Sequence, residues 1–382
     1  MDRRKFLVGA GLGLIAASAP ISISAFGAPT RKTTKSGRLK LSFVPFELKL
    51  RHAFNLAKSS RTSTPGVQVK LEYEGVVGYG EASMPPYLGE SIDSVTKFLS
   101  KLDLGQFNDP FKMEEILAYV DGVEAENRSA KASVDIALHD LVGKLIGQPW
   151  YKIWGLSLDK IPQSSFTIGI DTPEVVKQKI KEADDYKVIK IKLGLDNDKE
   201  MVDIIRQCTD RPICVDANRG WKSKEQALEM CEYLADKNCL FVEQPMMEDK
   251  LEETAWVRER SPLPIIADEV FHRLPDIVKL KDYYDGINIK LMKSTGMSEA
   301  YKMVTLARAF GMKIMCGCMT ETSCAIAAAA QLSPLIDWAD LDGNVLIAQD
   351  IFDGVKVING KVTPSDKPGI GVTPIKGLYP NF

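Results

Sequence analysis

From about residue 161 onward, the chain alternates short apolar runs with longer amphipathic stretches. The eight runs read SSFTIGI, VIKIKLG, PICVDAN, LFVEQP, PIIADE, GINIKL, KIMCGC and WADLDG. Between them lie stretches such as PEVVKQKIKEADDY and SEAYKMVTLARAF, whose apolar residues recur at helical spacing. Repeated strand–helix units predict parallel strands joined by crossover helices. The pattern therefore favours an α/β fold with a (β/α)8-type (modified TIM) barrel over residues 161–346, and an open doubly wound sheet is the alternative.

Residues 29–160 have a different pattern. LKLSFVPFELKLRHAF and GVQVKLEYEGVVGYGEAS are typical of antiparallel strands with glycine turns, and SAKASVDIALHDLVGKLIG predicts a helix that ends near Gly147. We expect an α+β capping domain here. The Gly- and Pro-rich segment after Ile347 predicts a hairpin, and we expect residues 347–382 to return to this capping domain.

The first 28 residues resemble a targeting signal. A basic start (Arg3, Arg4, Lys5) precedes an apolar stretch that is too short to span a bilayer, and small residues follow it. RRKFL resembles a twin-arginine export signal, with an ordinary secretory signal as the alternative. The sequence thus predicts an exported protein, located in the periplasm, without stable membrane insertion.

Composition narrows the possible chemistry. The formal net charge of −2 favours neither nucleic acid nor an anionic membrane surface. Only three histidines occur, without ligand spacing, which argues against a histidine zinc site or a Ser-His-Asp triad. The seven cysteines lie mostly in apolar runs, and we interpret even the Cys316–Cys318 pair as buried thiols. Carboxylates and lysines are left to carry any reaction.

Acidic residues end three successive predicted strands. Asp216, Glu243 and Asp268 are 27 and 25 residues apart, about one strand–helix unit each. A single acid at such a place is often a helix cap. Three carboxylates around one barrel mouth would repel one another unless a cation joined them, and oxygen ligands suit Mg²⁺. We therefore predict one Mg²⁺ per subunit at these three residues.

Lysines flank the acids in the sequence. Lys190 and Lys192 share one face of the second predicted strand, and Lys290 ends the sixth. In a closed barrel, the second and sixth strands face each other across the mouth. A substrate held at the metal would then have a lysine on each side.

Several of these motifs resemble those of the enolase superfamily, muconate-lactonising-enzyme subgroup. The match covers nearly all of the chain after the signal and includes GYGEAS, ASVDIALHDLVGK, WYKIWG, KIK, DAN, VEQP, ADE and GCMTETS. Within this subgroup, DLDGN is similar to the DxD motif of the dipeptide epimerases, in particular those that act on L-Ala-D/L-Glu.

The resemblance implies a role for each charged residue at the barrel mouth. It implies that the three acids bind Mg²⁺ and that Lys192 and Lys290 are the acid/base catalysts. Lys190 would support Lys192 and contact the substrate, and Asp340 and Asp342 would bind the α-ammonium group of a dipeptide. On pattern alone, these last two acids could equally be loop residues near a helix start. The implied reaction epimerises the C-terminal residue of a dipeptide, L-Ala-D-Glu from murein peptides.

The physical chemistry of such a reaction is compatible with two lysines. An α-proton beside a carboxylate is weakly acidic, and a metal on that carboxylate stabilises the enediolate that forms when the proton leaves. One lysine removes the proton and the other returns it to the opposite face, which inverts the centre. Because free lysine titrates near ~10.4, we expect burial, Lys190 and Mg²⁺ to lower the pKa of the base.

A loop of the predicted cap offers cations that could bind the side chain of the substrate. LRHAFNLAKSSRTS contains Arg51, Lys58 and Arg61, and we favour Arg61 for a glutamate side chain. The alternative is a solvated loop arginine.

Other functions stay open at this point. A muconate cycloisomerase, an o-succinylbenzoate synthase or an N-acylamino-acid racemase would share the fold, but their substrates lack a free ammonium group. An exported dipeptide-binding protein would explain the signal and the DxD pair, but not the facing lysines. The expected partner is a small dipeptide, and a homo-oligomer is possible.

Overall fold

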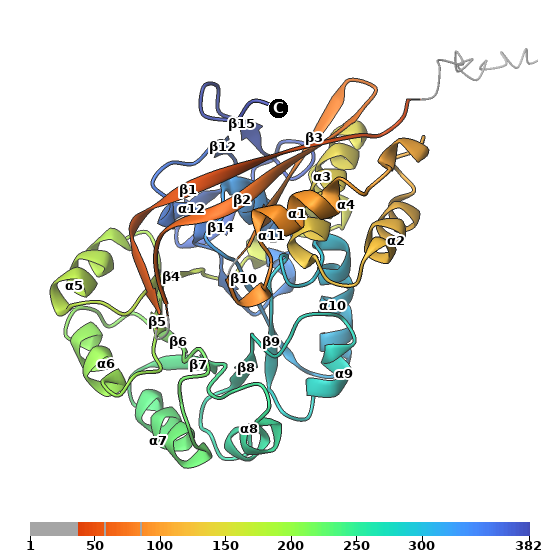
Figure 1. Ribbon diagram of the computed structural model, residues 1–382. Coiled ribbons are helices and arrows are strands. Elements are labelled where there is room, and N and C mark those ends of the chain that lie inside the picture. Colours follow the sequence, from red (N-terminus) through yellow and green to blue (C-terminus); the bar gives the residue numbers. More distant parts are fainter. Residues whose placement is uncertain (1–36, 57–58, 85) are drawn as a thin grey trace, which may run out of the picture. The chain divides into compact units, whose positions relative to one another are not determined.

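The computed structural model describes residues 37–56, 59–84 and 86–382 (Figure 1). The predicted export signal and Lys58 lie outside these residues. Within the described part of the chain, no helix has both the length and the apolar character needed to cross a membrane.

Eight parallel strands form the barrel that the apolar runs predict. Each strand pairs with its neighbours in chain order, and Ser164 and Ala339 form a bridge that links the two ends of the series. This order excludes the doubly wound alternative, so the predicted fold class is confirmed. The strands are β4 (Ser165–Ile168), β5 (Val188–Lys192), β6 (Ile213–Asp216), β7 (Cys239–Glu243), β8 (Ile265–Ala267), β9 (Gly286–Ile289), β10 (Lys313–Gly317) and β11 (Trp338–Asp340).

Helices surround the barrel in Figure 1 because every crossover returns the chain along the outside of the strands. In β5, for example, Ile189 and Ile191 join the large apolar core, while the alternate Lys190 and Lys192 contact acids of β7 and β6. The helices are α5 (Pro173–Glu182), α6 (Asp198–Arg206), α7 (Lys224–Ala235), α8 (Leu251–Arg258), α9 (Asp276–Leu280), α10 (Met297–Ala309), α11 (Ser323–Ala330) and α12 (Gly343–Leu346).

A separate apolar cluster fills the barrel below its charged mouth. Cys214, Phe241, Ile266 and Met315 are buried and pack together. The first three lie two residues before Asp216, Glu243 and Asp268, so strand alternation places each of them on the same face as the acid that follows it. The charged groups therefore lie above an apolar floor that excludes water from one side.

The cap contains an antiparallel sheet packed on a long helix. The sheet consists of β1 (Lys40–Leu56), β2 (Ser59–Tyr73) and β3 (Val76–Ser83). The helices are α1 (Ile92–Leu99), α2 (Met113–Val123), α3 (Arg128–Ile146) and α4 (Trp150–Ile153). A Cβ at Gly78 or Gly80 would lie 2.1 Å or 1.9 Å from a carbonyl oxygen of α3, so only glycine allows β3 to pack so closely.

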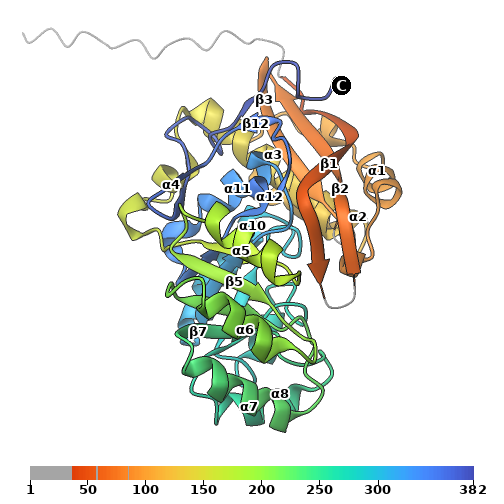
Figure 2. The same ribbon diagram turned by 90° about the vertical axis from the view of Figure 1, so that its left-hand side faces the viewer.

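The end of α3 confirms the predicted helix stop. The helix ends at Ile146, and Gly147 follows in the left-handed conformation with φ of 77°. Figure 2 shows the β1–β2 hairpin extending from the cap beside the barrel. The backbone N–H of Ile170 donates to Asn55 O at 3.1 Å, so the hairpin touches the segment that follows β4.

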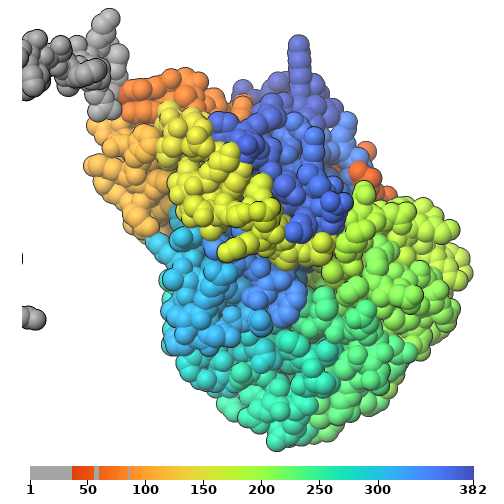
Figure 3. Space-filling view, turned by 180° about the vertical axis from the view of Figure 1, so that it is seen from behind, coloured from red at the N-terminus to blue at the C-terminus, as the bar shows by residue number. Residues whose placement is uncertain are grey.

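The residues after Ile347 contact both the cap and the barrel. The rings of Phe352 and Tyr379 pack edge-on against Tyr79 of β3, and Ser164 N donates to Gly360 O at 2.8 Å. Figure 3 shows this C-terminal segment, in dark blue, against the yellow segment that contains α3 and α4. The tail contains the short strands β12 (Phe352–Asp353), β13 (Lys356–Ile358), β14 (Lys361–Thr363) and β15 (Thr373–Pro374). The exact domain boundaries stay predictions.

One buried carboxylate joins cap sheet, helix and tail. Asp140 of α3 is 0% exposed and accepts hydrogen bonds from Tyr79 N at 2.9 Å, from Ile370 N at 3.0 Å and from Lys144 Nζ at 2.5 Å. These donors come from three separate parts of the chain. The carboxylate therefore fixes their relative positions.

We expect Asp140→Ala to lower the free energy of unfolding by about 3–5 kcal/mol, because it leaves two backbone N–H groups without an acceptor and removes the carboxylate that pairs with the half-buried Lys144. Urea denaturation of the full chain measures this loss. Asp282→Ala is the control, since the Asp282 side chain is exposed and its one ion pair among the described residues is with Lys281; we expect a change within about 0.5 kcal/mol. If Asp140→Ala lowered the free energy of unfolding as little as the control does, the structural role assigned to the Asp140 carboxylate would be wrong.

Candidate active site

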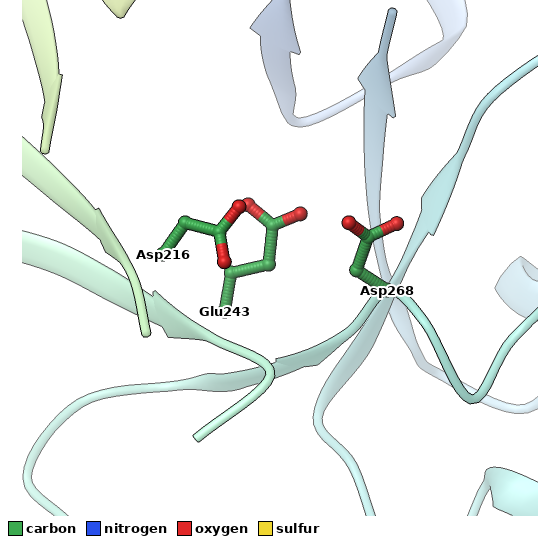
Figure 4. Close-up of side chains that lie close together, drawn as sticks. All are labelled: Asp216, Glu243 and Asp268. Carbon is green, nitrogen blue, oxygen red and sulfur yellow. The ribbon is translucent and has the colours of Figure 1, made fainter. Parts of the chain in front are cut away.

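The three predicted metal ligands lie together at the barrel mouth. Asp216 and Glu243 end β6 and β7, and Asp268 follows β8. Their carboxylate oxygens approach to within 4.8 Å of one another, and all three side chains are buried. Figure 4 shows the carboxylates of Asp216 and Glu243 side by side and that of Asp268 turned toward them. Parallel strands with acids at their carboxyl ends produce this arrangement directly.

The environment of the acids fits a divalent cation. Burial, and then the neighbouring carboxylate of Asp216, raise the pKa of Glu243 to about 8. Burial opposes ionisation of Asp268 as well, but the ammonium groups of Lys290 and Lys293 hold its pKa well below the usual range. Carboxylate oxygens are hard ligands of the kind that Mg²⁺ prefers. A divalent cation would also offset the repulsion between the three buried carboxylates. The residues present thus fit Mg²⁺.

The two predicted catalytic lysines reach the acids from different strands. Lys192 of β5 donates from Nζ to Asp216 Oδ2 at 2.5 Å. Lys290, directly after β9, donates from Nζ to Asp268 Oδ2 at 2.6 Å. A Cβ at Gly317 would lie 3.1 Å from Cε of Lys290, so the glycine leaves room for this side chain. The structure therefore brings both lysines to the same acidic cluster, and their catalytic roles stay predictions.

Lys190 links two groups of acids. Its Nζ lies 2.7 Å from Asp340 Oδ2, 2.6 Å from Glu243 Oε2 and 3.5 Å from Asp216 Oδ2, and the side chain is 1% exposed. This ammonium group thus connects the predicted metal ligands with the DxD motif. Sequence reasoning expects Lys190 beside Lys192, and the structure adds that its direct contacts are carboxylates.

The direction of the lysine pKa shifts differs from the expectation. Burial favours the neutral amine, but the carboxylates outweigh it and raise the pKa of both Lys190 and Lys290 well above the usual value. Asp340 and Glu243 act on Lys190, and Asp268 acts on Lys290. For Lys290 the carboxylates therefore act against the lowering that we expect of the base, and the expected effect of Mg²⁺ stays a prediction. A cation bound to the same carboxylates weakens the electrostatic attraction between these carboxylates and the lysine ammonium groups.

The DxD residues lie where the first and last barrel strands meet. Asp340 Oδ1 accepts a hydrogen bond from Ser165 Oγ at 2.6 Å, and Asp342 Oδ2 accepts one from Thr167 N at 2.6 Å. Burial, and then the charge of Asp340, raise the pKa of Asp342 to about 7. Both acids are buried. Asp340 accepts a hydrogen bond from Lys190 Nζ directly, whereas Asp342 is linked to Asp340 through Thr167, whose Oγ1 donates to Asp340 Oδ1 at 3.4 Å.

Arg61 of β2 reaches the barrel from the cap. Its Nη2 donates to Thr320 Oγ1 at 3.2 Å, beyond the end of β10, and its Nε is buried without a hydrogen-bond partner in the described part of the chain. Burial lowers the pKa of this guanidinium, and among the described residues no carboxylate forms an ion pair with it. Arg51, the other described candidate, donates from Nε to Ile347 O at 2.9 Å instead.

Sequence reasoning missed two buried residues of the site. Asn288 of β9 donates from Nδ2 to Glu243 Oε1 at 2.6 Å. The alternation in GINIKL could have indicated it, because Asn288 and Lys290 share a face. Lys293 donates from Nζ to Asp268 O at 2.6 Å and also to its carboxylate. No period in the sequence points to Lys293, because it lies in a turn after the strand.

The fold and the site agree with the family that the chain matches. Residues 40–155 match the mandelate racemase / muconate lactonizing enzyme N-terminal domain, and residues 174–377 match the enolase C-terminal domain-like family. The chain belongs to this branch of the enolase superfamily. The resemblance inferred from its motifs is thereby confirmed.

Individual proteins show more specifically than the family models which enzymes this chain is similar to. The L-Ala-D/L-Glu epimerase of Bacteroides thetaiotaomicron is 61% identical over 340 residues, which cover 89% of each chain. The L-Ala-D/L-Glu epimerase from Bacillus subtilis, solved as a substrate-liganded complex, aligns with a TM-score of 0.82 at 27% identity over 88% of this chain and 98% of that one. A dipeptide epimerase from Enterococcus faecalis, complexed with Mg and L-Leu-L-Tyr, aligns with a TM-score of 0.81 at 31% identity over 88% and 99% of the two chains.

We expect the Mg²⁺ affinity to rise with pH up to about 8 and then level off. The raised pKa means that Glu243 carries a proton below about pH 8, and Mg²⁺ binds only the ionised carboxylate, so a proton must leave. The dissociation constant should fall by about tenfold per pH unit between pH 6 and 8. Isothermal titration calorimetry in buffers of different ionisation enthalpy measures both the affinity and the released proton. An affinity that stays constant over this range would contradict the prediction.

Proposed function

We propose that this protein is a Mg²⁺-dependent dipeptide epimerase that interconverts L-Ala-D-Glu and L-Ala-L-Glu. The proposal rests chiefly on one observation. Lys192 of β5 and Lys290, directly after β9, both contact one cluster of acids that fits Mg²⁺. The high identity to an L-Ala-D/L-Glu epimerase supports the choice of substrate.

The reaction requires a base and an acid on opposite faces of the substrate α-carbon. Lys192 and Lys290 come from the second and sixth strands of the barrel, on either side of the strands that carry the acids. One amine accepts the α-proton, and the ammonium of the other lysine donates a proton to the opposite face. Bound Mg²⁺ supplies positive charge next to the substrate carboxylate, where negative charge develops. Reversing the two roles converts the product back to the substrate.

The remaining charged residues fit the ends of such a dipeptide. Asp340 and Asp342 form a negative pair at the junction of β4 and β11, which suits the α-ammonium group. Arg61 offers a desolvated guanidinium without an ion-pair partner among the described residues, which suits the glutamate carboxylate. A neutral side chain in the substrate would leave this cation uncompensated.

We further propose that the enzyme is exported by a twin-arginine signal and acts in the periplasm on peptides released from murein. The RRKFL start and the seven cysteines, none of them in a disulfide among the described residues, support export after folding. Replacing Arg3 and Arg4 with lysine should stop export of a fused reporter. Unchanged export would instead favour the ordinary secretory route.

The proposed activity is tested with wild-type protein, Mg²⁺ and L-Ala-D-Glu in D₂O. Proton NMR should show loss of the glutamate α-proton signal and appearance of the L-Ala-L-Glu diastereomer. L-Ala-D-Leu is the comparison substrate, and we expect a value of kcat/KM lower by about 100-fold or more, because the half-buried Arg61 then lacks its counter-charge. No solvent exchange and no diastereomer with either dipeptide would refute the proposal.

We expect Asp342→Asn to raise KM for the dipeptide by about 10–100-fold while the kcat falls less, because the substitution removes an ion pair with the ammonium group. Acetylating the N-terminus of the substrate should weaken binding to the wild type by a similar factor. Steady-state kinetics on both substrates measures the two effects. If Asp342→Asn and acetylation leave KM unchanged, the enzyme acts on a substrate without a free ammonium group.

A further inference from the structure

Lys293 is a buried lysine without a role in the proposed proton transfer. It lies three residues after Lys290, in the turn before α10, and its side chain is 0% exposed. Its Nζ donates to the main-chain oxygen of Asp268 at 2.6 Å and to Oδ1 of the same residue. A buried ammonium is costly unless its hydrogen bonds are satisfied, so this geometry indicates a specific task.

The contacts of Asp268 divide its two carboxylate oxygens between two lysines. Lys290 Nζ donates to Oδ2 at 2.6 Å, whereas Lys293 Nζ bonds Oδ1. The backbone N–H of Asp268 donates to Gln244 Oε1 at 3.0 Å. Lys293 thus hydrogen-bonds to both the backbone and the carboxylate of Asp268, which restricts rotation of the Asp268 side chain. Lys290, the proposed acid/base catalyst, bonds the other oxygen of this carboxylate.

The turn that carries Lys293 is itself anchored. Asp135 of the cap helix α3 accepts hydrogen bonds from Met297 N at 2.5 Å and from Ser298 N at 3.2 Å, at the start of α10. Lys293 N donates to Lys290 O at 2.9 Å within the turn. The position of Nζ is therefore set by the cap as well as by the barrel.

We propose that Lys293 is a positioning residue that fixes the carboxylate of Asp268 for Mg²⁺. The inference rests on the proposed metal site and goes beyond it by assigning a residue that does not itself bind the metal. Groups that hydrogen-bond to a ligating carboxylate orient it, and their removal typically weakens metal binding by about 10–100-fold. A purely electrostatic role would have the opposite sign, because removing a nearby positive charge would strengthen Mg²⁺ binding.

The test is the Mg²⁺ dissociation constant of the full-length Lys293→Met variant, measured by isothermal titration calorimetry. We expect it to be about 10–100-fold weaker than that of the wild type. The matched control is Lys131→Met, because Lys131 is also a buried lysine, 2% exposed, but bonds Asp121 Oδ1 at 2.9 Å and Glu124 O at 2.6 Å in the cap. The control should bind Mg²⁺ within about twofold of the wild type, even if it is less stable.

Unchanged or tighter Mg²⁺ binding by folded Lys293→Met, with a native circular dichroism spectrum, overturns the inference. If this variant does not fold, Lys293→Arg replaces it. Arginine keeps the charge but presents a planar fork, so we expect binding weaker by about fivefold, and wild-type affinity would overturn the inference. If the wild type itself binds no Mg²⁺, the proposed metal site fails, which the wild-type titration shows separately.

Discussion

The pairing of buried carboxylates with buried ammonium groups is the constraint on which the site depends. Asp216, Glu243 and Asp268 lie above an apolar floor, where isolated charges would be strongly disfavoured. Lys192, Lys290 and Lys190 each contact at least one of these acids. Removing one partner leaves an uncompensated buried charge on the other. The same contacts hold the proposed bases beside the predicted metal ligands.

The fold provides this pairing by simple means. Parallel strands place their carboxyl ends at one mouth, and alternation along β6, β7 and β8 puts an apolar residue below and an acidic residue above. The cap adds an arginine to the barrel mouth, because Arg61 contacts Thr320 beyond the end of β10. Barrel residues thus carry the proposed chemistry, while a cap residue is the one proposed to bind the side chain of the substrate.

Much of this arrangement could be predicted from the sequence because it depends on local periodicity. The apolar runs locate the barrel strands, and the acids at their ends indicate the cluster. Contacts between distant segments could not be predicted in this way. The partners of Lys190 include Asp340, 150 residues away, and these carboxylates raise the pKa of Lys190 although the side chain is buried. Lys293 lies in an irregular turn, where no pattern shows which way a side chain points.

The central claim is that Lys192 and Lys290 serve opposite faces of the same α-carbon. Its most direct test is solvent exchange by Lys192→Met and Lys290→Met in D₂O with Mg²⁺, using L-Ala-D-Glu and L-Ala-L-Glu separately. The account predicts that each variant exchanges the glutamate α-proton of one diastereomer only, that the two variants select opposite diastereomers, and that neither interconverts them. A single-lysine variant that exchanges both diastereomers, or still epimerises at the wild-type rate, would contradict the account.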